Sequence, residues 1–126
     1  MRFELQLGTD DYGDPEEFSW DLFPVVDSRR TLHLDQDGLP KLGTKIVPGM
    51  IIIGKIGKAK DYDPEHQPSA LEIHGLEPED LRRKYGHMWR DSSLYADEDA
   101  IGIVNRAFLE KTSNGAIKAI VELTVE

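Results

Sequence analysis

Cysteine is absent from the 126 residues, which excludes disulfides and thiolate metal sites and fits a reducing, intracellular compartment. No run approaches the roughly 18 to 20 apolar residues that a membrane span needs, and the opening MRFELQLGTDD is too polar for a signal peptide. We therefore expect a soluble, cytoplasmic protein with no membrane partner. A G-x-S-x-G nucleophile motif and a phosphate-binding glycine loop are also missing, so we predict no catalytic residue.

Recognisable metal-ligand spacing is missing as well. The run Asp35-x-Asp37-Gly38 lacks a closing glutamate, which favours a turn over a calcium loop. Three loop acids at positions 10, 11 and 14 leave open a hard-cation site, and with it a small metal-dependent enzyme, although nothing in the sequence fixes their geometry. No i, i+4 pair occurs among the histidines, which are His33, His66, His74 and His87. We predict no metal and no cofactor.

What the chain has in excess is acid: 24 acidic residues against 15 basic ones give a net charge of −9. A freestanding nucleic-acid binder usually carries the opposite sign. The acids crowd residues 1–37, whereas residues 38–60 carry no acid and five lysines. This basic segment is either a solvated face or a local surface that meets RNA, DNA or an acidic partner. The candidate nucleic-acid-proximal residues are Lys41, Lys45, Lys55, Lys58 and Lys60.

Hydrophobic periodicity predicts mostly strands. Apolar and polar residues alternate over 3–7 and again over 116–126, and Asn114-Gly115 before the second run is typical of a tight hairpin turn. The run 101–109 fits a strand or a helix. Met50 to Ile56 lacks alternation, which indicates one strand covered on both faces. Further short strands are expected at 18–24 (or an extended lid there), 31–34 and 71–73.

One short helix is predicted over 77–86. Pro78 suits the first helical position, acids follow it, and three basic residues precede Gly86, which ends the helix. Residues 57–70 read as a loop. The turn and structural residues singled out are Pro48, Gly49, Gly54 and Gly86. Residues 1–126 are thus expected to form a single β-rich domain. Because the alternation still runs at Glu126, we expect this domain to be a fragment of a longer chain.

Several motifs, in order, resemble the β subunit of bacterial DNA-directed RNA polymerase. Those motifs are Phe3-Glu4, Thr9-Asp10, GDPEEF (13–18), DLFP (21–24), LDQDG (34–38), Gly43, VPGMIIIGK (47–55), PEDL (78–81), Tyr85-Gly86, RDSSL (90–94), GIV (102–104) and GAIKAIV (115–121). Each motif is short, but their common order covers nearly the whole chain. The resemblance places the chain near the base of the flap.

The resemblance implies a fold and a role. It implies a barrel-sandwich-hybrid-like β module that is structural and non-catalytic, helping to shape the path of the RNA–DNA hybrid and of exiting RNA at the flap base or wall. The partners it implies are the remaining β and β-prime subunits, RNA and DNA. In the family, magnesium-binding aspartates lie on the partner large subunit, so nucleotidyl transfer would belong to the whole enzyme.

The chain also departs from the family pattern. Met50 replaces an aspartate, residues 95–99 replace a proline- and glycine-rich step, and only 111–114 separate two strands that in the family flank a long flap. The flap tip that docks a sigma factor is therefore missing, and the resemblance does not extend to sigma binding. A divergent polymerase or an engineered junction would explain the short flap. The alternative reading is a stand-alone barrel-sandwich adaptor or transcription-regulatory protein.

Overall fold

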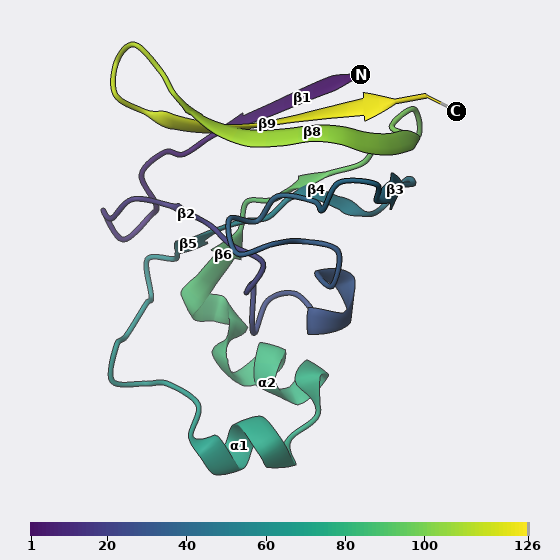
Figure 1. The fold of residues 1–126 in the computed structure, drawn as a ribbon. Coiled ribbons are helices and arrows are strands. Elements are labelled where there is room, and N and C mark those ends of the chain that lie inside the picture. Colours follow the sequence, from purple (N-terminus) through teal and green to yellow (C-terminus); the bar gives the residue numbers. More distant parts are fainter. Residues whose placement is uncertain (126) are drawn as a thin grey trace.

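The computed structural model describes residues 1–125, and its strands form three sheets above a pair of helices (Figure 1). The elements are β1 (Arg2–Gln6), β2 (Glu17–Phe18), η1 (Ser28–Arg30), β3 (Lys45–Ile46), β4 (Ile51–Ile53), β5 (Lys55–Lys58), α1 (Ala70–Gly75), α2 (Pro78–Tyr85), η2 (Gly86–Met88), β6 (Trp89–Asp91), β7 (Leu94–Tyr95), β8 (Gly102–Lys111) and β9 (Ile117–Thr124). The predicted mostly-β, barrel-sandwich-like architecture is confirmed. Neither helix is long and apolar enough to cross a membrane.

The largest sheet has four antiparallel strands in the order β1-β9-β8-β3. The strand predicted at 3–7 is β1, and the ambiguous run 101–109 belongs to strand β8. The predicted hairpin joins β8 to β9 through a five-residue loop, in which Gly115 adopts φ +86°, a conformation that glycine permits. The predicted strand over 116–126 ends at Thr124, and Glu126 lies outside the described residues.

The apolar run behind the Pro-Gly turn forms two strands rather than the single one predicted. β4 pairs with β7, whereas β5 pairs with β2 and β6, so the two halves belong to different sheets. Gly54 separates the two strands because its main chain bonds to loop residues rather than to a strand. Its N–H donates to the Gly38 carbonyl (2.8 Å), and its carbonyl accepts from the Ser19 N–H (3.0 Å). Residues 51–53 are nevertheless fully buried, as the lack of alternation predicted.

The main core lies between the four-stranded sheet and β4. Ile46, Ile52 and Ile53 pack there against β8 and β9 side chains. Burial of an aliphatic side chain of this size contributes about 1.5–3 kcal/mol to stability. The inward residues from β8 and β9 in this cluster are Val104, Ala119, Val121 and Leu123.

The predicted helix is α2. Pro78 occupies its first turn, and Leu81 and Tyr85 face inward. Gly86 caps the helix with a right-handed backbone conformation, so the chain continues directly into η2. The strand predicted at 71–73 is wrong, because this segment lies in helix α1. The side chain of Ser69 accepts from the Glu72 N–H, and the Glu72 carboxylate accepts from the Ser69 N–H, forming a capping box.

The strand predicted at 31–34 is also wrong. Residues 31–34 follow η1 as a turn, in which the Leu34 N–H donates to the Thr31 carbonyl at 3.0 Å, and only one isolated bridge joins Leu34 to Pro40. In the segment 18–24, only Phe18 lies in a strand, and the remainder turns around Leu22. Leu22 and Leu34 belong to a second small core with Ile51 and Ile56, so their burial does not require a ladder.

Candidate functional site

The acid-free basic segment meets acids in space, because the acidic loop before β2 folds onto β5. The Lys55 ammonium lies 2.9 Å from the Glu16 carboxylate and donates to the Gln6 carbonyl at 3.1 Å. Lys55 is only 8% exposed. Its charge is therefore paired inside the fold, and almost none of the side chain is exposed to solvent.

Asp10 holds this loop in place. Its carboxylate accepts from the backbone N–H of Tyr12 (3.1 Å), Asp14 (2.8 Å) and Lys58 (3.0 Å). Desolvation raises the pKa of Asp10, but these backbone hydrogen bonds outweigh it and the pKa lies below its usual value. Asp10 thus serves as a structural anchor between the loop and the end of β5.

The possible cation site at the loop acids is taken up by protein partners. Asp14 pairs with the Lys58 ammonium at 2.8 Å and Asp11 with the Arg90 guanidinium at 2.8 Å, while Asp10 binds backbone. Within residues 1–125, no three acidic or histidine side chains group in a way that suits a metal ion. The three loop acids are thus engaged by protein groups.

Lys58 sits among aromatic rings. Its ammonium lies 5.8 Å from the Tyr12 ring centroid and 5.1 Å from that of Tyr62, and Tyr62 packs edge-on against Trp89 at 5.1 Å. The hydrogen bond to Asp14 raises the pKa of Lys58, so the lysine remains charged. These contacts stabilise the cation locally and neutralise much of its field.

The remaining candidate lysines are exposed and lie in two places. Lys41 and Lys45 flank the start of β3, and the Lys41 ammonium donates to the Leu32 carbonyl at 3.4 Å. Lys60 follows β5, and β5 and β3 lie toward opposite sides of the view in Figure 1. The five lysines therefore do not form one continuous surface.

Arg30 adds a cation beside the Pro48-Gly49 turn, which no sequence signal indicated. Its guanidinium donates to the Gly49 carbonyl at 3.2 Å and lies 5.5 Å from the Tyr95 ring centroid. Gly49 has φ +91°, as expected for a turn glycine, and its N–H donates to the Ala96 carbonyl at 2.9 Å. Only the tertiary fold brings η1 next to this turn.

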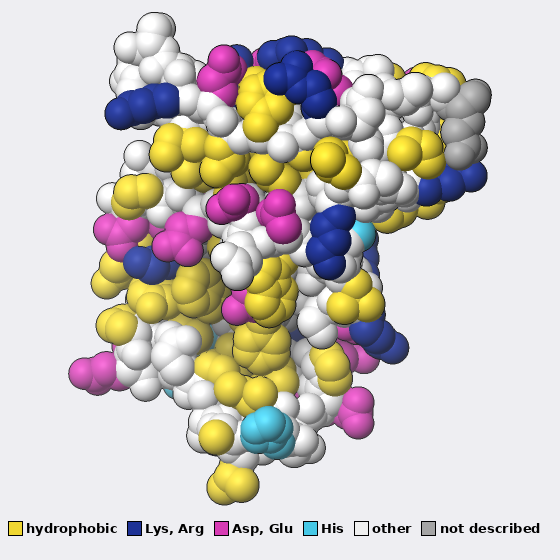
Figure 2. Space-filling view, in the orientation of Figure 1, with side chains coloured by type: hydrophobic (Ala, Val, Ile, Leu, Met, Phe, Trp, Pro, Cys, Tyr) yellow, Lys and Arg dark blue, Asp and Glu magenta, His cyan; other side chains and the backbone are white. Residues whose placement is uncertain are grey.

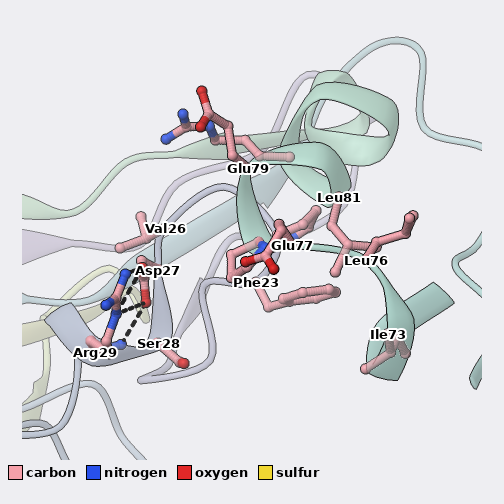
Figure 3. Close-up of a pocket in the computed structure, with 13 residues that line it drawn as sticks. Phe23, Val26, Asp27, Ser28, Arg29, Ile73, Leu76, Glu77, Glu79 and Leu81 are labelled. Carbon is pink, nitrogen blue, oxygen red and sulfur yellow. Dashed lines mark hydrogen bonds and ion pairs between the residues drawn. The ribbon is translucent and has the colours of Figure 1, made fainter.

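A groove of about 630 Å³ opens between the helices and the segment 23–29 (Figure 3). Phe23, Ile73 and Leu76 line its apolar part, each more than one-third exposed. At its rim, Asp27 and Arg29 form an ion pair at 2.6 Å, and the Arg29 guanidinium lowers the Asp27 pKa to about 2. The groove thus combines an apolar wall with an internally neutralised edge.

Comparison with known proteins identifies the class to which this fold belongs. Residues 7–126 match the family described as RNA polymerase Rpb2, domain 6, and the chain belongs to that family. It is similar to a segment of the DNA-directed RNA polymerase subunit beta of Phocaeicola vulgatus (31% identical over 112 residues) and of Porphyromonas cangingivalis (30% over 114 residues). These matches cover 83% and 85% of the chain but 8% of each relative's length.

Proposed function

We propose that the chain is a structural, non-catalytic segment of a DNA-directed RNA polymerase β subunit at the flap base or wall, where it helps shape the path of the RNA–DNA hybrid and of exiting RNA. The observation that carries this proposal is the family match across residues 7–126. The β-rich core supports it, because a rigid scaffold can hold exposed cations in place around nucleic acid.

We assign this role to cations that are exposed on the fold. Lys41 and Lys45 are exposed beside β3, and Arg30 lies at the turn that follows it. Lys58 and Lys60 would act from the other side of the molecule. Lys55 supports the fold through Glu16 and is left out of the contact surface. Phosphate contacts from such side chains position nucleic acid without reading its sequence.

The proposed partners are the remaining β and β-prime polypeptides, RNA and DNA, assembled in the cytoplasm. The proposal does not extend to a sigma factor, because β8 and β9 are joined by only five residues, 112–116. Nucleotidyl transfer is assigned to the assembled enzyme rather than to this segment.

Site-specific photocrosslinking tests the placement. A photoreactive residue would replace Lys41 or Lys45 in the complete polymerase, with one at Leu71, which is 86% exposed on α1, as the matched control. We expect crosslinks to RNA or DNA in elongation complexes from positions 41 and 45 but not from 71. Crosslinks to protein alone from all three positions would contradict the nucleic-acid role. A protein that never enters a polymerase complex would favour the stand-alone adaptor.

A further inference from the structure

Strand β8 leaves much of one edge without a partner strand. β3 covers it only at Gly102 and Ile103, and main-chain bonds link the adjoining Val104 to Gly43 and Thr44 (both 2.9 Å). The register then shifts between Val104 and Arg106. Among residues 1–125, no strand pairs with this edge from 105 to 111.

The register shows which main-chain groups face this open edge. Met1 and Leu7 bond to odd-numbered residues of β9, so the even-numbered residues of β9 face β8. These pair with Arg106, Phe108 and Glu110. Because hydrogen-bonding direction alternates along a strand, the N–H and C=O groups of Ala107, Leu109 and Lys111 point outward. Such a row of donors and acceptors, otherwise left to water, is a template for pairing with an extended chain.

The hairpin also carries apolar surface beyond the core. Leu109 and Ile117 lie on the same face as the fully buried Ala119 and Val121, yet each is 41% exposed. The hairpin end projects past the rest of the molecule in Figure 1. Figure 2 shows a band of hydrophobic side chains across this view, below the charged side chains of the upper sheet. An added strand would cover this apolar margin.

The opposite face of β8 shows which charges such a strand would need. Phe108 lies between Arg106 and Glu110, which are 63% and 50% exposed at the side chain. Both already form long ion pairs with β9: Arg106 lies 4.0 Å from Glu122, and Glu110 lies 3.8 Å from Lys118. In β9, the strand that already pairs antiparallel with β8, residues 118–122 consist of a base, three apolar residues and an acid. The base lies opposite Glu110 and the acid opposite Arg106.

We propose that the free edge of β8 accepts a second antiparallel strand with this same pattern, a basic residue opposite Glu110, an acidic residue opposite Arg106 and apolar residues between them. This inference rests on the proposed function, because its occupant is an extended segment of the polymerase polypeptide outside residues 1–126. Main-chain bonds provide affinity in strand addition, and the charge pair fixes register. The added strand would extend the curled sheet from four strands to five.

The other free edge of the sheet, on β1, is less suited to this role. Its outward residues include Arg2 and Glu4, which pair with each other at 3.1 Å, and the outward Gln6 carbonyl is already bonded to the Lys55 ammonium. Charged side chains along an edge discourage strand addition. The outward residues of β8 are Ala107, Leu109 and Lys111, of which only the last is charged, so strand addition is assigned to β8.

A binding experiment on the 126-residue chain tests the proposal without the polymerase. The probe is a labelled synthetic peptide with the sequence of residues 117–123, IKAIVEL, and the control peptide exchanges its lysine and glutamate. We expect the probe to bind the wild-type chain more tightly than the control does. Leu109→Pro, which removes an outward N–H that β9 does not use, should weaken binding at least about tenfold. Leu109→Ala, which keeps that N–H, should weaken it less.

A second variant distinguishes loss of the binding edge from general loss of structure. Arg106→Glu with Glu110→Arg should reverse the preference between the two peptides, which general loss of structure cannot do. Equal binding of both peptides by all variants, or no binding, would overturn the proposal. Sedimentation showing a dimer that Leu109→Pro dissolves would make a second copy the occupant and overturn the assignment to the polymerase. Because none of these measurements involves the polymerase, their failure is distinct from failure of the proposed function.

Discussion

The Lys55 ammonium and the Glu16 carboxylate, 39 positions apart in sequence, meet at 2.9 Å with side chains only 10% and 13% exposed. The carboxylate also accepts from the Gly8 N–H at 2.8 Å. This contact fastens the acidic loop to β5 and neutralises the buried lysine of a segment that carries no acid of its own.

Replacing Glu16 with Gln should destabilise the fold, because the enclosed Lys55 ammonium loses its countercharge. We expect a loss of about 2–3 kcal/mol in the free energy of unfolding, below the value for a fully buried pair because some solvent reaches this one. Urea denaturation measures it, with Glu17→Gln at an exposed neighbouring position as the control. The double variant Glu16→Gln, Lys55→Met should lose less than Glu16→Gln alone. Equal stability of Glu16→Gln and wild type would contradict the role of the pair.

Replacing Gly54 with Ala should also be destabilising, for a steric reason. A Cβ atom there would lie 2.2 Å from the Ser19 carbonyl oxygen, so β2 and β5 would have to separate. We expect a cost of at least about 2 kcal/mol. Gly75→Ala is the matched control, because its Cβ meets no atom within 4 Å and alanine favours helix, so α1 should gain slightly. A common melting temperature for both variants would refute this account of Gly54.

The effect of replacing Gly49 on stability should depend on the backbone conformation that the new residue can adopt, and not on steric contacts of its side chain. Its φ of +91° disfavours L-residues, but a Cβ atom would meet nothing within 4 Å. Gly49→Val should therefore cost about 1–2 kcal/mol or more, while Gly49→Asn costs less, because asparagine adopts left-handed backbone more readily. Thermal unfolding compares the two. An unchanged melting temperature in Gly49→Val would show that the Pro48-Gly49 turn does not hold this conformation in solution.

Glu72 should make stability depend on pH. Hydrogen bonds from the Lys84 ammonium (2.5 Å), the Tyr85 hydroxyl (2.6 Å) and the Ser69 N–H (3.2 Å) lower its pKa from about 4.5 to about 2. A carboxyl with a depressed folded-state pKa stabilises the fold above its unfolded value, and this contribution disappears as the pH falls through the folded value. The stability difference between wild type and Glu72→Gln should thus shrink from pH 5 to pH 2.

Chemical denaturation at several pH values measures that difference, and NMR titration of the Glu72 carboxyl gives its pKa directly. Glu65→Gln, on an exposed loop residue, serves as the control. A difference that stays constant across this range would mean that Glu72 is not held by Lys84 and Tyr85 in solution.

Local chemistry in the sequence was enough to predict several elements. Pro78 and Gly86 bound α2, Asn114-Gly115 predicts the β8–β9 hairpin, and Gly49 has the positive φ expected at its turn. The error at 71–73 was avoidable, because Ser69 and Glu72 already have the spacing of a capping box. Signals of this kind act over three or four residues, so they can be read directly from the sequence.

The candidate site could be predicted only as a list of lysines. The positive charges can be read from the sequence, at Lys41, Lys45, Lys55, Lys58 and Lys60, but their partners cannot. Folding enclosed Lys55 with Glu16 and paired Lys58 with Asp14. It left Lys41 and Lys60 exposed and added Arg30 beside Gly49. Which charges face solvent depends on contacts between distant segments, and no short pattern records these.

The sequence by itself determined a β-rich, cysteine-free chain of the RNA polymerase Rpb2 domain 6 family, because composition, turn residues and motif order are carried by the residues themselves. Only the tertiary structure decided that Gly54 divides one apolar run between two sheets, and that part of the β8 edge has no partner strand among residues 1–125. The physical reason is that strand pairing and burial are satisfied by partners far along the chain. Their choice depends on the packing of the whole domain rather than on any local preference.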